Sequence, residues 1–414
     1  MMNLFKIVLV LLFLWNGSKI WAQQELNKSD VALTLLMQES DRGRFAYEYN
    51  SWVEQFKAAL SVSLEDSIAQ WHPQILQQLE LPNSGMRVYY LLKPWDEHSF
   101  EMKWLVRFQF GQMISVCDFS HEFTVPLIKK LPADSVFSVS SDNANNQFNA
   151  IVMRGATSGN SYLECPDLRS LVLFELLHDR TIDESSREAL LKELNDRLMV
   201  LWNDVALFNR DWSCFKRMIT LQSLDKKMRI STYLVPGSGF DSYVKGAVLR
   251  HQGDRIEVTL LKDETAEIKT PERSRLSSDK WYGALYTDLI ETRHKDQTFY
   301  TLLGFKSNDG LVKTRLVDAV SFSGKKVYFG MAQFKSGGKT LYRHIFKYAA
   351  GANMMLRYDD RMKMIVFDHL TPSESFYNGQ YQYYGPDFSY DGYRFEKGIW
   401  LLEVDIDLRN PKLK

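Results

Sequence analysis

The second half of the chain alternates short apolar segments with tight-turn signals, and this pattern constrains the fold more than any other feature. From about Lys227 onward the turn signals are Gln252-Gly253-Asp254, Asn308-Asp309-Gly310, Ser323-Gly324-Lys325, Gly337-Gly338, Asp359-Asp360 and Glu396-Lys397-Gly398. The segments 255–261, 298–305, 326–334, 341–348, 362–367 and 399–405 between them are predicted as strands. Because consecutive strands with short links pair antiparallel, we expect an antiparallel β-meander, built as a sandwich, an open sheet or a small propeller.

The first part of the chain mixes helices with a few strands. One helix is predicted from five aromatic and aliphatic residues at spacings of three and four, which are Phe45, Tyr49, Trp52, Phe56 and Leu60. A second helix is expected over 64–79, with a break near Pro73. Alternation predicts strands between 86 and 123 and a short strand at 150–153.

A second helical insertion is expected at 167–179 and from Thr181 toward Phe208, where Thr181 to Glu184 fits a capping box. The fold class is therefore α+β, with N-terminal helices, a short sheet, this insertion and a large C-terminal meander domain. We predict a mixed N-terminal region at 23–225 and a β-rich C-terminal domain at 226–414.

The first 22 residues have the features of a signal peptide. Lys6 precedes the apolar run Ile7 to Trp15, and Ala22 offers a small residue for cleavage. The run is too short to span a bilayer, which needs about 20 residues, and no other apolar run approaches that length. The sequence therefore predicts an exported, soluble protein, periplasmic or extracellular, with no transmembrane segment in the mature chain.

The charge balance gives no support for an electrostatic partner. The chain has 51 basic and 51 acidic residues, and cleavage after residue 22 would leave 49 against 51, a formal charge of −2. A nearly neutral chain lacks the long-range field that gathers nucleic acid or an anionic membrane. We therefore expect no nucleic-acid partner.

The C-terminal third resembles a known family. The resemblance lies in Lys280-Trp281-Tyr282-Gly283-Ala284-Leu285-Tyr286, in Leu303-Gly304-Phe305 with Asn308-Asp309-Gly310, and most distinctively in Ile365-Val366-Phe367-Asp368-His369-Leu370-Thr371-Pro372 and the run from Gly379 to Tyr393. These motifs resemble uncharacterised exported proteins of Gram-negative bacteria. The resemblance implies export and, because that family has no assigned activity, it transfers no catalytic residue.

Aromatic residues are concentrated between Phe376 and Trp400, with ten in 25 residues. Flat apolar rings with a polar handle suit stacking on a sugar or anchoring a protein partner. The predicted ligand-binding residues are Tyr381, Tyr383, Tyr384, Asp387, Tyr390, Asp391, Tyr393 and Trp400. The alternative is that these rings close over the core of the β domain.

The carboxylates near these rings leave a catalytic alternative open. A secreted hydrolase acting on glycans would draw its two acids from Asp368, Glu374, Asp387 and Asp391. No nucleophile elbow accompanies Asp368-His369, so no catalytic residue is assigned and the favoured interpretation is a non-catalytic binding or structural protein.

Metal and cofactor motifs are weak. Asp387, Ser389, Asp391 and Gly392 match the opening of a calcium loop, but Gly398 occupies the position of the bidentate glutamate. An Asx turn leading into a hairpin explains the same residues. Cys117 and His121 share a strand face without further ligands. We therefore predict neither a metal nor a cofactor.

Three cysteines permit one disulfide. Cys165 and Cys214 flank one helical unit, whereas Cys117 lies in a strand-like run. In an oxidising compartment we predict a Cys165–Cys214 bridge.

Overall fold

The computed structural model describes residues 33, 36–61, 77–81, 86–94, 99–110, 113–124, 136–142, 147–154, 166–237, 242–306 and 310–408. The chain forms two compact units, one of Met1–Ser140 with Ile151–Leu163 and one of Ser141–Ala150 with Glu164–Lys414. The predicted boundary after residue 225 differs from this division. It would separate two paired strands, since Met218–Gln222 is hydrogen-bonded to Met228–Pro236.

In the described part of the first unit, a long helix packs on a four-stranded antiparallel sheet. The helix is α2 (Arg42–Ser61), and the strands follow one another in the order β1 (Gln77–Leu81), β2 (Met86–Pro94), β3 (Ser99–Phe110) and β4 (Met113–Thr124). The predicted aromatic face of α2 is buried at Phe45, Tyr49, Trp52 and Phe56 and packs with Tyr89, Leu91 and Leu105 of the sheet. A separate hairpin joins β5 (Val136–Asp142) and β6 (Gln147–Arg154).

The helix predicted over 64–79 is wrong at its end. Residues 77–81 form strand β1, where Leu79 faces Val88 across an antiparallel pair. The preceding residues, 62–76, lie outside the described part of the chain. Pro73 disfavours a helix that continues past it, and pairing with β2 sets the extended conformation of residues 77–81.

The main part of the second unit, from Glu164 onward, begins with two helices, α4 (Leu168–His178) and α5 (Glu184–Asn203). Each begins at an aspartate N-cap. Asp167 accepts a hydrogen bond from the backbone of Arg169, and Asp183 accepts one from Ser186. Asp183 thus caps α5 in place of the predicted Thr181, and the helix ends at Asn203, short of Phe208.

Three sheets form the rest of the second unit. The first has the order β10 (Arg255–Lys262), β9 (Ser242–Gln252), β8 (Met228–Pro236) and β7 (Met218–Gln222). The second has β11 (Leu276–Ser277), β15 (Lys326–Phe329), β14 (Val312–Ser323), β13 (Gln297–Lys306) and β12 (Leu285–His294), with β18 (His344–Ala349) also paired to β14. The third has β17 (Lys339–Leu341), β16 (Phe334–Ser336), β22 (Ile399–Glu403), β21 (Tyr384–Glu396), β20 (Met364–Pro372) and β19 (Leu356–Asp359).

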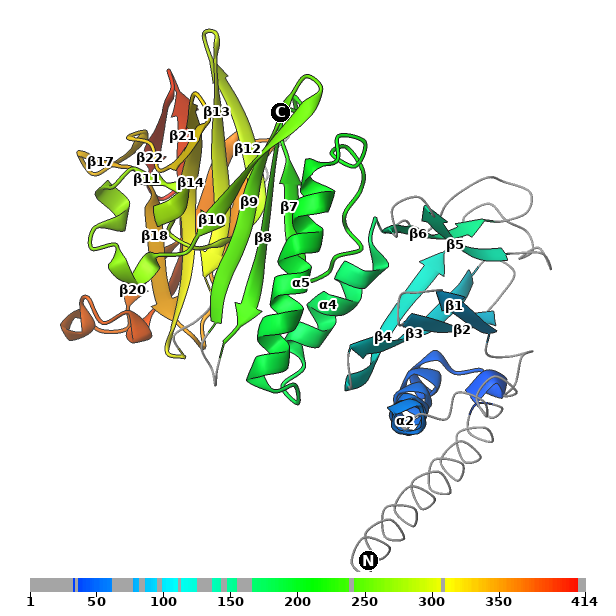
Figure 1. Ribbon diagram of the computed structural model, residues 1–414. Coiled ribbons are helices and arrows are strands. Elements are labelled where there is room, and N and C mark those ends of the chain that lie inside the picture. Colours follow the sequence, from blue (N-terminus) through cyan, green and yellow to red (C-terminus); the bar gives the residue numbers. More distant parts are fainter. Residues whose placement is uncertain are drawn as a thin grey trace, which may run out of the picture. The chain divides into compact units, whose positions relative to one another are not determined.

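The second sheet is the middle layer of a stack. Its strands bury both faces, because successive side chains point to opposite sides. Leu302 and Leu316 pack with Ile230 and Val248 of the first sheet. Their neighbours Leu303 and Val317 pack with Ile365, Tyr393 and Trp400 of the third. Figure 1 shows α4 and α5 on the outer side of the first sheet.

The predicted α+β class with a C-terminal antiparallel β-rich domain is confirmed. Of the three arrangements that the sequence permitted, the structure has stacked open sheets. One pair departs from the antiparallel rule, since β16 runs parallel to β22. No helix of the described residues is long and apolar enough to cross a membrane.

Candidate functional site

Burial divides the aromatic run between Phe376 and Trp400 into two groups. Tyr393 and Trp400 are fully buried in the core between the second and third sheets, and Trp400 donates its indole N–H to Thr301 Oγ1 at 3.0 Å. The sequence-based prediction of these two as ligand contacts is therefore corrected, because their rings supply core packing. Tyr390 is half-buried in β21.

The second group is exposed, and we call its four members the aromatic surface. They are Phe376, Tyr381, Tyr383 and Phe388, with exposed fractions of 64%, 41%, 40% and 92%. Among the described residues only Tyr47 and Tyr243 are other aromatic side chains of comparable exposure. Phe376 and Tyr383 both contact the ring of Tyr377, and exposed rings grouped in this way mark interaction sites more often than single exposed apolar residues do.

Two short 3-10 helices, η4 (Ser375–Tyr377) and η5 (Tyr381–Tyr383), present most of these rings. They lie in the connection between β20 and β21. The ring of Tyr377 contacts Phe376 on one side and Tyr383 on the other, at centroid distances of 4.0 and 3.9 Å. Phe376 and Tyr383 are thus held against Tyr377 before any partner arrives, which lowers the entropy lost on binding.

Tyr384 braces this connection from the first position of β21. Its hydroxyl donates to Asn378 Oδ1 at 2.9 Å and accepts the backbone N–H of Gly379 at 2.9 Å. Its ring lies 5.2 Å from that of Tyr381. Lys347 Nζ is 5.6 Å from the Tyr381 centroid, within reach of a cation–π contact. Tyr384 therefore holds the connection that carries the aromatic surface and is not itself one of its four exposed rings.

Phe388 projects from a distortion of strand β21. The β20–β21 register shifts between Asp368 and Leu370, and Phe388 lies in the bulged stretch with a φ of 69°. Asp387 stabilises the bulge, since its Oδ1 accepts the backbone N–H and the hydroxyl of Ser389 at 3.1 and 2.7 Å. A bulky residue in the left-handed region raises the free energy of the folded state. Phe388 is exposed, so burial of its ring does not offset this cost.

Three of the four carboxylates proposed for hydrolysis accept structural hydrogen bonds. Asp368 Oδ2 accepts the backbone N–H of Met355 at 2.6 Å, and Asp387 caps its own turn. Asp391 accepts Nδ1–H of His369 at 2.7 Å and the backbone N–H of Asp405 at 3.1 Å. Glu374 is exposed and makes no capping hydrogen bond to η4. This arrangement matches turn and strand stabilisation rather than a pair of converging acids.

Two histidines in the field of Asp391 have contrasting environments. The hydrogen bond from His369 to Asp391 raises the pKa of the His369 imidazole above its ordinary value. His344 contacts the rings of Phe346, Phe367 and Tyr393, and burial lowers its pKa to about 4. Within the described residues, no group of three or more His, Cys, Asp or Glu side chains has the arrangement of a metal site.

The cysteines divide between the two units. Cys214 is buried and disulfide-bonded, and Cys117 is buried in β4. Cys165 lies outside the described residues, so its pairing with Cys214 stays a prediction. The signal peptide predicted at residues 1–22 also lies outside them.

The sequence analysis missed two features. Phe376 and Phe388 were not among the predicted contacts, although a phenylalanine between two turn-forming residues, as in Asp387-Phe388-Ser389, is a usable signal. A cavity beside α5 was missed as well, because its residues come from four separate elements and share no motif. Comparisons with protein-family models, with curated proteins and with solved structures each found no match to this chain.

Proposed function

We propose that this protein is a non-catalytic exported binding protein whose partner engages the aromatic surface. The observation that carries the proposal is the exposure of Phe376, Tyr381, Tyr383 and Phe388 within one short, internally braced segment. Exposed rings outside the core, one of them at the strained backbone position of Phe388, are better explained by a contact than by packing.

The partner class that this surface fits best is a glycan. Pyranose rings present flat C–H faces, which stack on aromatic side chains, and their hydroxyls need hydrogen-bonding groups nearby. Asn378, Gln380 and Gln382 supply exposed side-chain amides beside the rings. The hydrogen bonds made by Asp368, Asp387 and Asp391 favour binding over hydrolysis. Export rests on the leader sequence of residues 1–22.

The test is retention on a glycan array, with product analysis of the eluate. We expect retention without product release, and at least tenfold weaker binding by Tyr383→Ala and Phe388→Ala, since stacked aromatics are common hot spots. Tyr47→Ala is the matched control, because Tyr47 is also an exposed tyrosine, at 74%, but lies in α2 of the other unit.

Three results would overturn this function. Released oligosaccharide products would indicate a hydrolase. Equal loss of retention in Tyr47→Ala would show nonspecific adsorption. Failure to retain any glycan would remove carbohydrate as the partner, and binding of a protein by the same surface would then replace the proposal.

A further inference from the structure

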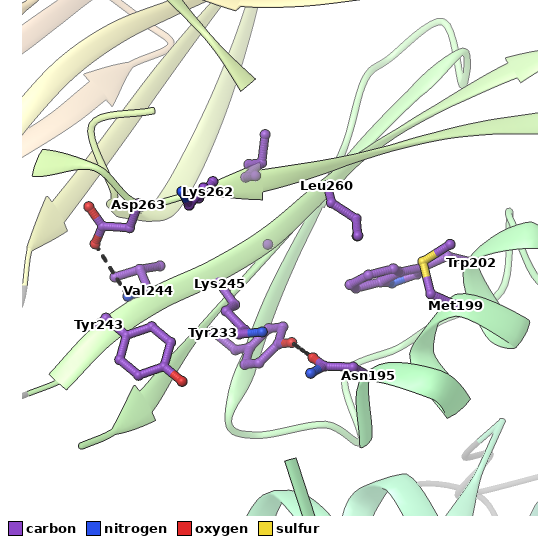
Figure 2. Close-up of a pocket in the computed structure, with 12 residues that line it drawn as sticks. Asn195, Met199, Trp202, Tyr233, Tyr243, Val244, Lys245, Leu260, Lys262 and Asp263 are labelled. Atoms are coloured by element: carbon purple, nitrogen blue, oxygen red, sulfur yellow. Dashed lines mark hydrogen bonds between the residues drawn. The ribbon is translucent and has the colours of Figure 1, made fainter. Parts of the chain in front are cut away.

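The second unit contains a cavity that is separate from the aromatic surface. It lies between the second half of α5 and the outer face of β8, β9 and β10, as Figure 2 shows in close-up. Its volume is about 490 Å³, within the range of roughly 300–1,000 Å³ that small-molecule sites occupy.

The walls of the cavity are largely apolar. Trp202 and Met199 line it from α5, and Leu260 lines it from β10. Leu260 is 56% exposed and Tyr243 of β9 is 40% exposed, so apolar surface continues from the wall to solvent. An apolar wall that is open to solvent suits a ligand with an apolar body.

Lys245 of β9 is the unusual polar group in this cavity. Its side chain is half-buried, and burial lowers the pKa of its ammonium. Within the described residues it makes no ion pair, unlike Lys262 at the other end of the lining, which is paired with Glu264. A partly desolvated cation without a counter-charge is unfavourable unless an anion joins it.

The nearest acid of the lining does not supply that counter-charge. Asp263 accepts hydrogen bonds from Thr265 Oγ1 at 2.6 Å and from the backbone N–H of Gly283 at 3.2 Å, and it lies 3.7 Å from Lys306 Nζ. Asp263 also accepts the backbone N–H of Val244 at 3.4 Å, so its carboxylate is engaged by these groups and forms no ion pair with Lys245.

Two further polar groups complete the wall. Tyr233 donates its hydroxyl to Asn195 Oδ1 at 2.9 Å, which leaves the amide nitrogen of Asn195 as a donor. Trp202 Nε1 is buried without an acceptor among the described residues. The lining therefore offers the amide nitrogen of Asn195 as a donor and Lys245 as a cation without an ion pair, a combination that selects an acceptor-rich anionic group.

We propose that this cavity binds an amphipathic carboxylate, with the carboxylate at Lys245 and the apolar body against Trp202, Met199 and Leu260. A carboxylate provides the missing counter-charge, and an aliphatic or aromatic chain covers the exposed apolar wall. The site lies on other elements than the aromatic surface and does not depend on the proposed function.

The test uses dodecanoate as the probe, followed by titration calorimetry and tryptophan fluorescence of the full mature chain. A chain of this size in a cavity of mixed polarity is expected to bind with a Kd of about 1 mM or below. Dodecanol, which has the same chain without the charge, should bind about tenfold more weakly, because a charge-assisted hydrogen bond is lost.

Substitutions at the two lysines of the lining test which ammonium group binds the carboxylate. Lys245→Met should weaken dodecanoate binding about tenfold and leave dodecanol unchanged, whereas Lys245→Arg should keep the preference for the acid. Lys262→Met is the matched control, since Lys262 lines the same cavity but is already paired. Phe388→Ala should bind dodecanoate as the unaltered protein does, which separates this site from the aromatic surface.

The proposal is overturned by any of four results. The first three are no dodecanoate binding at 1 mM, equal binding of dodecanoate and dodecanol, and a Lys245→Met variant, folded by circular dichroism, that binds dodecanoate unchanged. Loss of binding in Lys262→Met to the same extent would also contradict it, because the effect would then be one of general surface charge.

Discussion

Phe388 offers a test in which backbone strain and side-chain contact can be separated. Its φ of 69° lies in the left-handed region, and its side chain is 92% exposed. We predict that Phe388→Gly is more stable than Phe388→Ala. This reverses the usual order, in which alanine stabilises relative to glycine by about 0.4–1 kcal/mol through the unfolded state.

The magnitude follows from opposing contributions. A non-glycine residue in the left-handed conformation costs about 1–2 kcal/mol, which glycine avoids and alanine retains. The unfolded-state term subtracts about 0.4–1 kcal/mol from the advantage of glycine. The ring is lost in both variants, and with so little of it buried its removal costs under about 0.5 kcal/mol either way. The free energy of unfolding of Phe388→Gly should therefore exceed that of Phe388→Ala by about 1 kcal/mol.

The assay is urea denaturation, comparing free energies of unfolding for the two variants. The control is the same pair at Phe376, which is 64% exposed and has no positive φ, where alanine should be the more stable. A free energy of unfolding for Phe388→Ala that equals or exceeds that of Phe388→Gly would refute backbone strain at this position. Both Phe388 variants should lose glycan retention, since each lacks the ring.

The other predictions concern the core and the disulfide. Arg343→Met should destabilise the second unit by about 3–5 kcal/mol in urea denaturation, because Arg343 and Asp318 form a fully buried ion pair at 3.1 Å; a loss under 1 kcal/mol would contradict this. The folded-state pKa of His344 is lowered to about 4, so the unfolded state binds more protons than the folded state below about pH 6.5. The free energy of unfolding should therefore fall by about 2 kcal/mol from pH 7 to pH 5. The His344→Gln variant should lack this part of the pH dependence. Non-reducing peptide mapping should recover Cys214 linked to Cys165, and equal thiol counts with and without reductant would exclude the bridge.

The sequence by itself determined the elements that depend on local pattern. Phe45, Tyr49, Trp52 and Phe56 lie on one helical face because their spacing permits no other helical arrangement. Turn signals such as Gly253 and Gly324, both at positive φ, fixed where the strands of the meander end.

The tertiary structure alone decided which strands are buried on both faces and which side chains remain exposed to solvent. Leu302 and Leu303 look alike in sequence, yet they face different sheets, because the stacking of three sheets follows from long-range contacts. For the same reason Trp400 lies in the core while Phe388 is exposed. The cavity at Lys245 exists only where α5 and three strands meet, so no local pattern encodes it.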